Sequence, residues 1–136
     1  MRYFLDTSVI MYAAGAAHEY KQPCIAILER IEQKSLEVFT STEVVQELLY
    51  RYTRLGRKSD GVALARSIMG FVPVLPVDEA IIESAIELLQ RYEVDPRDAL
   101  HAAVALNFGI STIISADQHF DRMQEIKRID PRVLTS

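Results

Sequence analysis

Short apolar runs rich in strand-forming residues alternate in this chain with longer segments whose apolar residues recur at helical spacing. The apolar runs, including a short final one, lie at residues 2–5, 36–39, 71–77, 112–115 and 125–130. The helical segments are expected at about residues 7–14, 20–33, 41–55, 58–69, 79–92 and 96–108. This alternation predicts an α/β fold with a mainly parallel sheet.

Capping signals indicate where three of the helices begin. Thr40 and Glu43 match a Thr-x-x-Glu capping box, and Gly56 would end the helix that follows. Asp78 is expected to cap the next long helix, and Asp95, followed by a proline, the one after it. The buried face of the helix after Asp78 is expected to consist of Ile81, Ile82, Ala85, Leu88 and Leu89.

The run at residues 71–77 contains two prolines, which a central strand does not tolerate. We therefore expect this strand at an edge of the sheet. Two of the connections between strands hold two helices each, so some helices are expected to cross the sheet obliquely.

Length, charge and cysteine content narrow the class of protein. The chain has 136 residues, which predicts one domain spanning residues 1–136. Its net charge is −4, so binding of nucleic acid would need local basic patches or a metal ion in an acidic site. Cys24 is the only cysteine, which fits a reducing, cytoplasmic location. No apolar run approaches the roughly 20 residues of a membrane-spanning helix, so no membrane association is expected.

Four carboxylates stand where a parallel α/β fold places ligands. Asp6 and Asp117 each follow an apolar run, at the carboxyl end of an expected strand. Glu47 lies at the margin of the apolar face of its helix, and Asp98 lies in the first turn of another helix. The sequence therefore predicts that these four acids meet at one end of the sheet.

Each acid also has a purely structural explanation. Asp6 and Asp117 are suitable helix caps. Asp98 would interact favourably with the positive end of its helix dipole, and Glu47 could be a solvated acid paired with Arg51 four residues later.

A divalent cation would resolve the mutual repulsion of clustered carboxylates, which otherwise raises their pKa values. Oxygen ligands alone suit Mg²⁺ or Mn²⁺, whereas the scattered histidines do not form a zinc site. Of these histidines, His101 is expected to be packed or near a cap, and His119 to lie on a turn, although it could touch a substrate. Such a site suggests phosphodiester hydrolysis, in which the cation activates water and stabilises phosphate charge.

Four segments, taken in order, resemble a PIN domain, and specifically the VapC-type toxin ribonucleases of toxin–antitoxin pairs. They are "FLDTSVIMY", "VVQELLYRY", "DPRDALHAAVALNFG" and "IISADQHFDRM". The resemblance implies a three-layer α/β/α sandwich whose parallel sheet has strand order 3-2-1-4-5. It also implies Mg²⁺- or Mn²⁺-dependent endonucleolytic cleavage of RNA, a homodimer, and a VapB-like protein antitoxin as partner.

The same resemblance assigns roles to individual residues. Its four acids fall on Asp6, Glu47, Asp98 and Asp117, as catalytic residues and metal ligands. Ser8 matches a hydrogen-bonding residue beside the first acid, and Thr7 lies next to it as a second candidate for contact with substrate or ligands.

Other features and other functions stay open at this point. Asp121 is either a fifth acid of the site or a structural residue. The basic residues Arg51, Arg54, Arg57, Lys58 and Arg66 could bind phosphates or form a solvated helix face. A non-catalytic RNA-binding or scaffold module with the same fold is the alternative function. Receiver domains and aspartate-nucleophile phosphatases also place acids at strand ends, but their motifs do not match the residues after Asp6.

Overall fold

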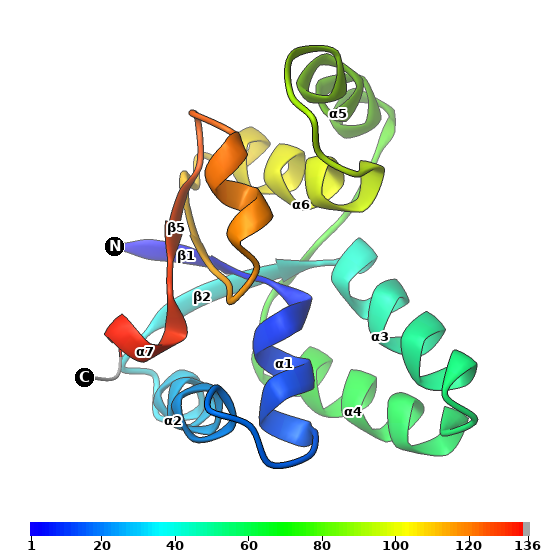
Figure 1. Cartoon of the computed structure of the whole chain (residues 1–136), viewed down its shortest axis with the longest axis vertical. Helices are drawn as coiled ribbons and strands as arrows, with labels where there is room; N and C mark the ends of the chain where they lie inside the picture. Colours follow the sequence, from blue (N-terminus) through cyan, green and yellow to red (C-terminus); the bar gives the residue numbers. More distant parts are fainter. Residues whose placement is uncertain (135–136) are drawn as a thin grey trace.

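A single parallel sheet organises the computed structural model, which describes residues 1–134. Within these residues the sheet has five strands in the order β3-β2-β1-β4-β5 (Figure 1). They are β1 (Arg2–Leu5), β2 (Glu37–Ser41), β3 (Val74–Leu75), β4 (Thr112–Ile114) and β5 (Lys127–Ile129). Every neighbouring pair is parallel. The predicted fold class and strand order are confirmed, and β3, which Pro73 and Pro76 flank, lies at the edge as predicted.

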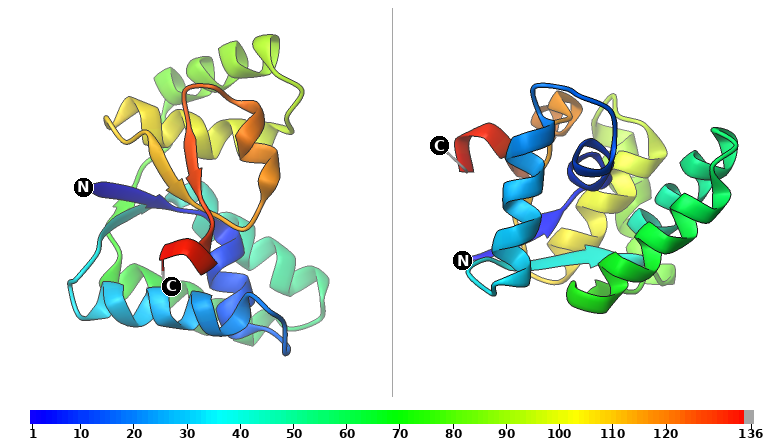
Figure 2. Two further views of the ribbon diagram at one scale, coloured as in Figure 1. Left: turned by 60° about the vertical axis from the view of Figure 1, so that its left-hand side comes forward. Right: turned by 90° about the horizontal axis from the view of Figure 1, so that it is seen from below.

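Helices cover both faces of this sheet. They are α1 (Thr7–Ala14), α2 (Lys21–Glu32), α3 (Thr42–Arg54), α4 (Lys58–Phe71), α5 (Glu79–Arg91), α6 (Pro96–Asn107), the 3₁₀ helix η1 (Gln118–Arg122) and α7 (Pro131–Leu134). In Figure 1, α5 and α6 lie on one side of the sheet and α1, α2 and α4 on the other. Figure 2 shows α2 beside α1 and α7 against α2.

In each connection that holds two helices, the two helices pack against one another. The pair α3 and α4 fills the connection between β2 and β3, and α5 and α6 fill the connection between β3 and β4. The helices of each pair contact one another, and in Figure 1 α5 is seen almost end-on while α6 lies across the view, so these two helices cross rather than run side by side. Between β1 and β2, α1 and α2 also pack together.

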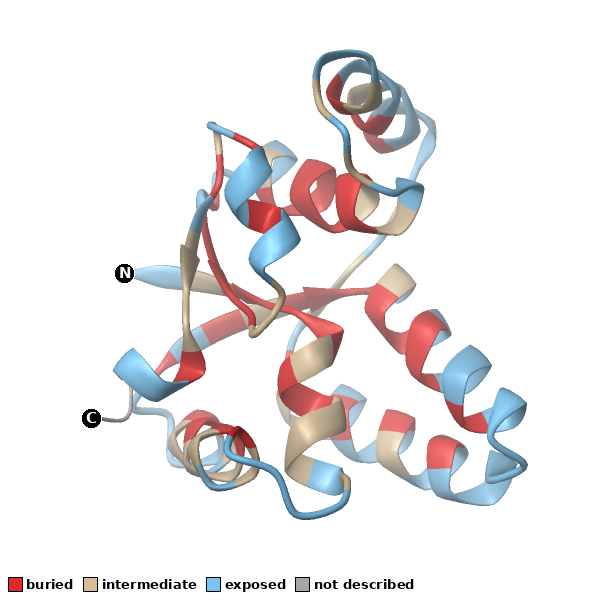
Figure 3. Ribbon diagram, viewed as in Figure 1, coloured by how far each residue is buried: buried red, intermediate tan, exposed pale blue. Residues whose placement is uncertain are grey.

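The core lies between the central strands and the helices on each side (Figure 3). Phe4 and Leu5 of β1 and Ile113 and Ile114 of β4 are fully buried, as expected for strands covered on both faces. Helix α6 contributes mostly small side chains, namely the buried Ala99, Ala102, Ala103 and Ala105. Small residues let the backbone of α6 approach the rest of the core closely.

Two sequence predictions about helices are wrong. The cap of α3 is Ser41 rather than Thr40, since the Ser41 Oγ accepts from the backbone N of Val44 at 3.1 Å. Thr40 still belongs to β2, where its Oγ1 donates to the carbonyl of Leu5 at 3.0 Å. Ile82 is 42% exposed, because α5 contacts α6 along a narrower face than its apolar stripe.

Among residues 1–134, we find no helix that combines the length and the apolar character needed to cross a membrane.

Candidate active site

An open cleft lies at the carboxyl ends of β1 and β4, beside the first turns of α1 and α6. The four predicted acids Asp6, Glu47, Asp98 and Asp117 all line it, together with Thr7 and Ser8. The sheet topology explains this convergence. Strands β1 and β4 are parallel neighbours, so their carboxyl ends meet at the same edge.

Asp6 stands between β1 and α1 and is almost fully buried. One of its carboxylate oxygens, Oδ2, accepts from the hydroxyls of Ser8 and Ser115, each at 2.6 Å, and from the Ser8 backbone N at 3.3 Å. Asp6 is therefore also the cap of α1, as its structural explanation required. Because these bonds all use Oδ2, they leave the Oδ1 of Asp6 available for another contact.

A short hydrogen-bonded chain links Asp6 to Asp117. The Ser115 hydroxyl donates to Asp6 and accepts from the backbone N of Asp117 at 2.9 Å. The Ser8 hydroxyl also accepts from the backbone N of Ala116 at 3.1 Å. Ser8 thus holds the first acid in place, as predicted, and Ser115 does so too. Ser115 was missed in the sequence because serine at the end of a strand carries no specific signal.

Asp98 lies in the first turn of α6, whose cap is Asp95. The Asp98 side chain is buried and accepts no hydrogen bond from residues 1–134. Burial, followed by the negative charges of Asp95, Asp117 and Asp6, raises the pKa of Asp98 to about 7. The negative charges that raise this pKa also favour the binding of a positively charged ligand beside Asp98.

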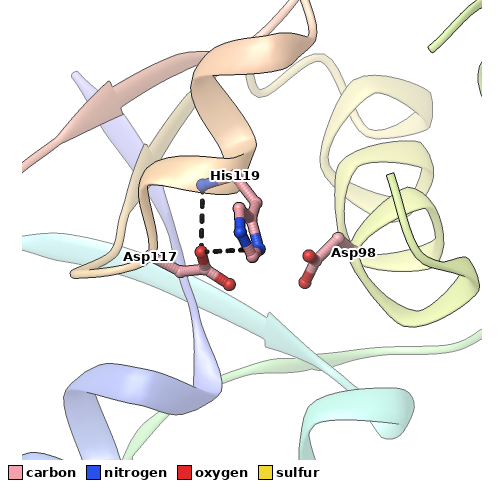
Figure 4. A group of neighbouring side chains, drawn as sticks. All are labelled: Asp98, Asp117 and His119. Atoms are coloured by element: carbon pink, nitrogen blue, oxygen red, sulfur yellow. Dashed lines mark hydrogen bonds and ion pairs between the residues drawn. The ribbon is translucent and has the colours of Figure 1, made fainter. Parts of the chain in front are cut away.

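Asp117 and His119 face Asp98 across the cleft (Figure 4). One potential ligand atom from each of the three residues lies within 4.8 Å of the others. The Asp117 Oδ1 accepts from the backbone N of His119 at 2.9 Å and lies 3.3 Å from its Nδ1. Asp117 therefore caps η1 as well as lining the cleft. The turn predicted at His119 is the 3₁₀ helix η1, whereas its proximity to Asp98 and Asp117 was not predicted.

Glu47 is buried, so its explanation as a solvated acid is wrong. Its Oε1 accepts from the Thr7 hydroxyl at 2.7 Å and lies 3.0 Å from the His101 Nε2. Its Oε2 accepts from the Arg51 Nε at 2.8 Å, which confirms the predicted pairing with Arg51. Burial raises the pKa of Glu47, but the bonds from His101 and Thr7 and the charges of His101 and Arg51 outweigh it and lower the pKa to about 2. Both carboxylate oxygens of Glu47 are thus already engaged.

His101 is packed in the core, as predicted, yet it also belongs to the site. Its Nε2 contacts Glu47 and lies 4.0 Å from the Asp6 Oδ1, while its Nδ1 is buried without a hydrogen-bond partner among residues 1–134. Burial lowers the pKa of His101, but its bond to Glu47 and the charges of Asp6, Glu47 and Asp98 raise it above its ordinary value. The available signal was its place one turn after Asp98, which puts both on one helix face.

Asp121 has a structural role, and most of the basic run lies outside the cleft. The carboxylate of Asp121 accepts from the Nε and Nη2 of Arg128 at 3.0 and 3.2 Å, and it does not line the cleft. Of the basic run, Arg51 alone lines the cleft. Two cations from other segments, Arg97 and Arg122, line it as well.

The residues present fit a hard divalent cation. Asp98, Asp117 and His119 each offer one ligand atom within 4.8 Å of the others, and Asp6 lines the same cleft outside that group. The Asp98 carboxylate accepts no hydrogen bond within residues 1–134 and lines the cleft close to other acids, so it is available to a cation, which would offset the negative charge there. Oxygen-rich donor sets suit Mg²⁺ or Mn²⁺.

Comparison with known proteins places this geometry in a family. The family model of the PIN domain matches residues 3–126. This chain belongs to the PIN-domain family. Ribonuclease VapC13 of Mycobacterium tuberculosis is 34% identical over 127 residues, covering 92% of this chain and 97% of that protein. Ribonuclease VapC7 of the same organism is 31% identical over 130 residues, covering 93% and 90%.

Solved structures agree with the PIN-domain fold. The sarcin–ricin loop cleaving toxin VapC20 of M. tuberculosis has a TM-score of 0.72 at 25% identity, covering 88% of this chain and 92% of that one. The toxin–antitoxin complex VapBC2 of Rickettsia felis, bound to a promoter DNA fragment, includes a chain with a TM-score of 0.74 at 18% identity, covering 96% and 100%. The predicted resemblance to VapC-type PIN domains is thereby confirmed.

Proposed function

We propose that this PIN-domain protein is a metal-dependent endoribonuclease that hydrolyses RNA phosphodiesters, and that it is the toxin of a toxin–antitoxin pair. The observation that carries this proposal is the convergence of Asp6, Asp98 and Asp117 around one cleft, with Asp98 buried and lacking a hydrogen-bond donor among residues 1–134. The names of the VapC relatives support the choice of RNA as substrate.

Each residue of the cleft has a proposed role. Asp6, Asp98 and Asp117 would hold Mg²⁺ or Mn²⁺, which when bound lowers the pKa of water and stabilises charge on the phosphate. Ser8 and Ser115 orient Asp6.

Glu47 belongs to the same catalytic set. Because its oxygens are engaged by Thr7, His101 and Arg51, we assign it to positioning the first turn of α1 and to contact with a cation through water. Arg51, Arg97 and Arg122 would bind the phosphates of RNA at the rim of the cleft.

Partners and location follow from the same proposal. A homodimer and a VapB-like antitoxin would cover apolar side chains that the monomer leaves exposed on α3, α4 and α5. These include Leu49, Val62, Met69, Ile82 and Ile86. The cytoplasm is the expected location, where both RNA and antitoxin would be available. We also treat residues 1–136 as one functional domain.

Asp6→Asn and Asp98→Asn test the proposal. Each variant removes one charge that would hold the cation, so each should reduce Mn²⁺-dependent cleavage of single-stranded RNA by about 100-fold or more, since even changes behind metal ligands cost about 10–100-fold. The measurement is gel analysis of an end-labelled RNA pool incubated with the purified chain and Mn²⁺. Asparagine also caps helices, so the swap at Asp6 separates a ligand role from a cap role.

Asp121→Asn is the matched control, because it makes the same chemical change at a carboxylate that Arg128 holds outside the cleft. It should cleave RNA like the wild-type chain. Cleavage at wild-type rates by both Asp6→Asn and Asp98→Asn would contradict the proposal. Binding of RNA by the wild-type chain without cleavage in either metal would favour the non-catalytic RNA-binding alternative instead.

A further inference from the structure

Three aromatic rings pack together between the end of α1 and the start of α2. The ring centroids of Tyr12 and His18 are 4.7 Å apart, and those of Tyr12 and Tyr20 are 5.3 Å apart. The rings of His18 and Tyr20 are nearly parallel, with an angle of 12° and a centroid distance of 5.9 Å. We call Tyr12, His18 and Tyr20 the aromatic wall.

Tyr20 anchors this wall in the protein. Its ring is buried, and the guanidinium of Arg132 lies 4.5 Å from the ring centroid. Its hydroxyl donates to the Oδ2 of Asp130 at 2.6 Å. Because Asp130 and Arg132 belong to the C-terminal part of the chain, the wall is attached to a second segment of the fold.

His18 is held in a defined orientation although it is exposed. Its Nδ1 accepts from the backbone N of Tyr20 at 3.1 Å, and its carbonyl accepts from the backbone N of Lys21 at 3.0 Å. The Lys21 ammonium donates to the carbonyl of Gly15, which ties the start of the loop to α2. An exposed aromatic ring held in this way is pre-ordered and loses little conformational entropy on binding.

Tyr12 and His18 line the same cleft as the acids. Met11, Gly15, Ala16 and Ala17 complete this side of the cleft with small or apolar groups. Asp6 and Asp117 follow strands β1 and β4, Glu47 and Asp98 lie on helices α3 and α6, and the cations Arg51, Arg97 and Arg122 also line the cleft. The cleft lining thus combines aromatic side chains, acids that could hold a metal ion, and arginines.

This combination matches the chemistry of a single RNA strand. Unpaired bases stack on aromatic side chains, while phosphates contact arginine and metal ions. We infer that the aromatic wall is a base-stacking subsite, in which an unpaired base next to the cleaved phosphate packs against Tyr12 and His18. This inference rests on the proposed ribonuclease function and adds that the strand must be unpaired at one defined position.

The test uses a series of short fluorescent single-stranded RNAs, each with one abasic nucleotide at a successive position. Fluorescence anisotropy in Ca²⁺ gives Kd, and cleavage in Mn²⁺ gives kcat/KM. For the wild-type chain, one abasic position should weaken binding about 5- to 150-fold, the range found for loss of one base–aromatic stack. The other abasic positions should have smaller effects.

His18→Ala and Tyr12→Ala should weaken binding of the intact RNA by a similar factor and should lose the penalty at that abasic position. Tyr12→Phe keeps the ring and should therefore keep the penalty at that abasic position. Phe108→Ala is the matched control, because Phe108 is an exposed aromatic residue outside the cleft lining. Circular dichroism checks that both alanine variants are folded, since His18→Ala also removes the acceptor of the Tyr20 backbone N.

The possible failures are distinguishable. If the alanine variants keep the full abasic penalty, or bind intact RNA as tightly as the wild-type chain, the aromatic wall is not a base-stacking subsite, even though Asp98-dependent cleavage stands. If the wild-type chain neither binds nor cleaves any RNA of the series, the proposed function falls and this inference falls with it.

Discussion

At the scale of single residues, Asp98 has an environment that favours its neutral form. Its folded pKa of about 7 lies well above the ordinary value of 3.8 because the side chain is buried near three other acids. Without metal, the folded protein therefore binds a proton that the unfolded chain releases. Asp98 consequently destabilises the folded state above pH 7, and this cost disappears as the pH falls toward 4.

We expect the metal-free chain to be more stable at pH 5.5 than at pH 8 by an amount on the order of 2 kcal/mol from this residue. Asp98→Asn should be more stable than the wild-type chain at pH 8 and should lose most of this pH dependence. Urea denaturation in EDTA at several pH values measures both effects. A wild-type chain whose stability rises from pH 5.5 to pH 8, and equals that of Asp98→Asn, would refute the assigned environment.

Glu47 has the opposite environment, since donors surround both of its oxygens. Glu47→Ala should lower the free energy of unfolding by about 3 kcal/mol, because it leaves the buried His101 without its partner. Glu43→Ala is the control. It removes a carboxylate from a more exposed pair with Arg97, where N and O are 3.2 Å apart, and should cost less than about 1 kcal/mol. Equal losses of unfolding free energy for the two variants would show that the Glu47 hydrogen bonds do not stabilise the fold more than an exposed ion pair does.

At the scale of elements, the start of α3 decides whether Glu47 points into the protein. The Ser41 cap lies one residue later than the capping box suggested, at the end of β2. Six residues further on, Glu47 reaches the buried face beside Leu48. A capping residue fixes the first turn of a helix, so Ser41 contributes to the geometry of the site as well as to stability.

Ser41→Ala should lower the free energy of unfolding by about 1 kcal/mol, the usual cost of losing a cap. Ser35→Ala is the comparison, because its hydroxyl donates to the carbonyl of Arg30 at an exposed position outside the helices. That variant should change stability by no more than about 0.5 kcal/mol. Chemical denaturation of both variants measures the difference, and a Ser41→Ala variant as stable as Ser35→Ala would argue against the cap.

At the scale of the whole molecule, the cleft joins elements that are far apart in the chain. Asp6 lies between β1 and α1, Asp98 lies in α6, and Asp117 precedes η1. A cation bound by all three would hold these elements together in the folded state only. By mass action, binding of this kind raises stability in proportion to the logarithm of the metal concentration.

Mn²⁺ should therefore raise the melting temperature, with a stabilisation of about 2.7 kcal/mol at one hundred times the dissociation constant. EDTA should reverse the shift. Differential scanning fluorimetry should find the shift abolished in Asp98→Asn and retained in Asp121→Asn, whose carboxylate pairs with Arg128 outside the cleft. An equal shift in all three proteins would mean that the ion binds elsewhere.

The structure also separates what local patterns can predict from what they cannot. The order of the strands and of helices α1 to α6, the edge position of β3 and the caps at Asp78 and Asp95 were predicted, whereas the short helices η1 and α7 were not. The contact of His101 with Glu47 was not, because the two residues are 54 positions apart and on different helices. The exposure of Ile82 was missed for the same reason, since it depends on how much of α5 its neighbour covers.

The sequence by itself determined that this chain alternates strands and helices, and that acids follow two of its strands and enter two of its helices. These properties follow from residue spacing, capping residues and apolar runs, which depend on only a few neighbouring residues. Only the tertiary structure decided which of these acids are free to bind an ion. It gave Glu47 three donors, left Asp98 without one among residues 1–134, and brought Asp98 within 4.8 Å of ligand atoms of Asp117 and His119. The physical reason is that charge and hydrogen bonding depend on distances in space, which parallel strand pairing sets for residues far apart in the chain.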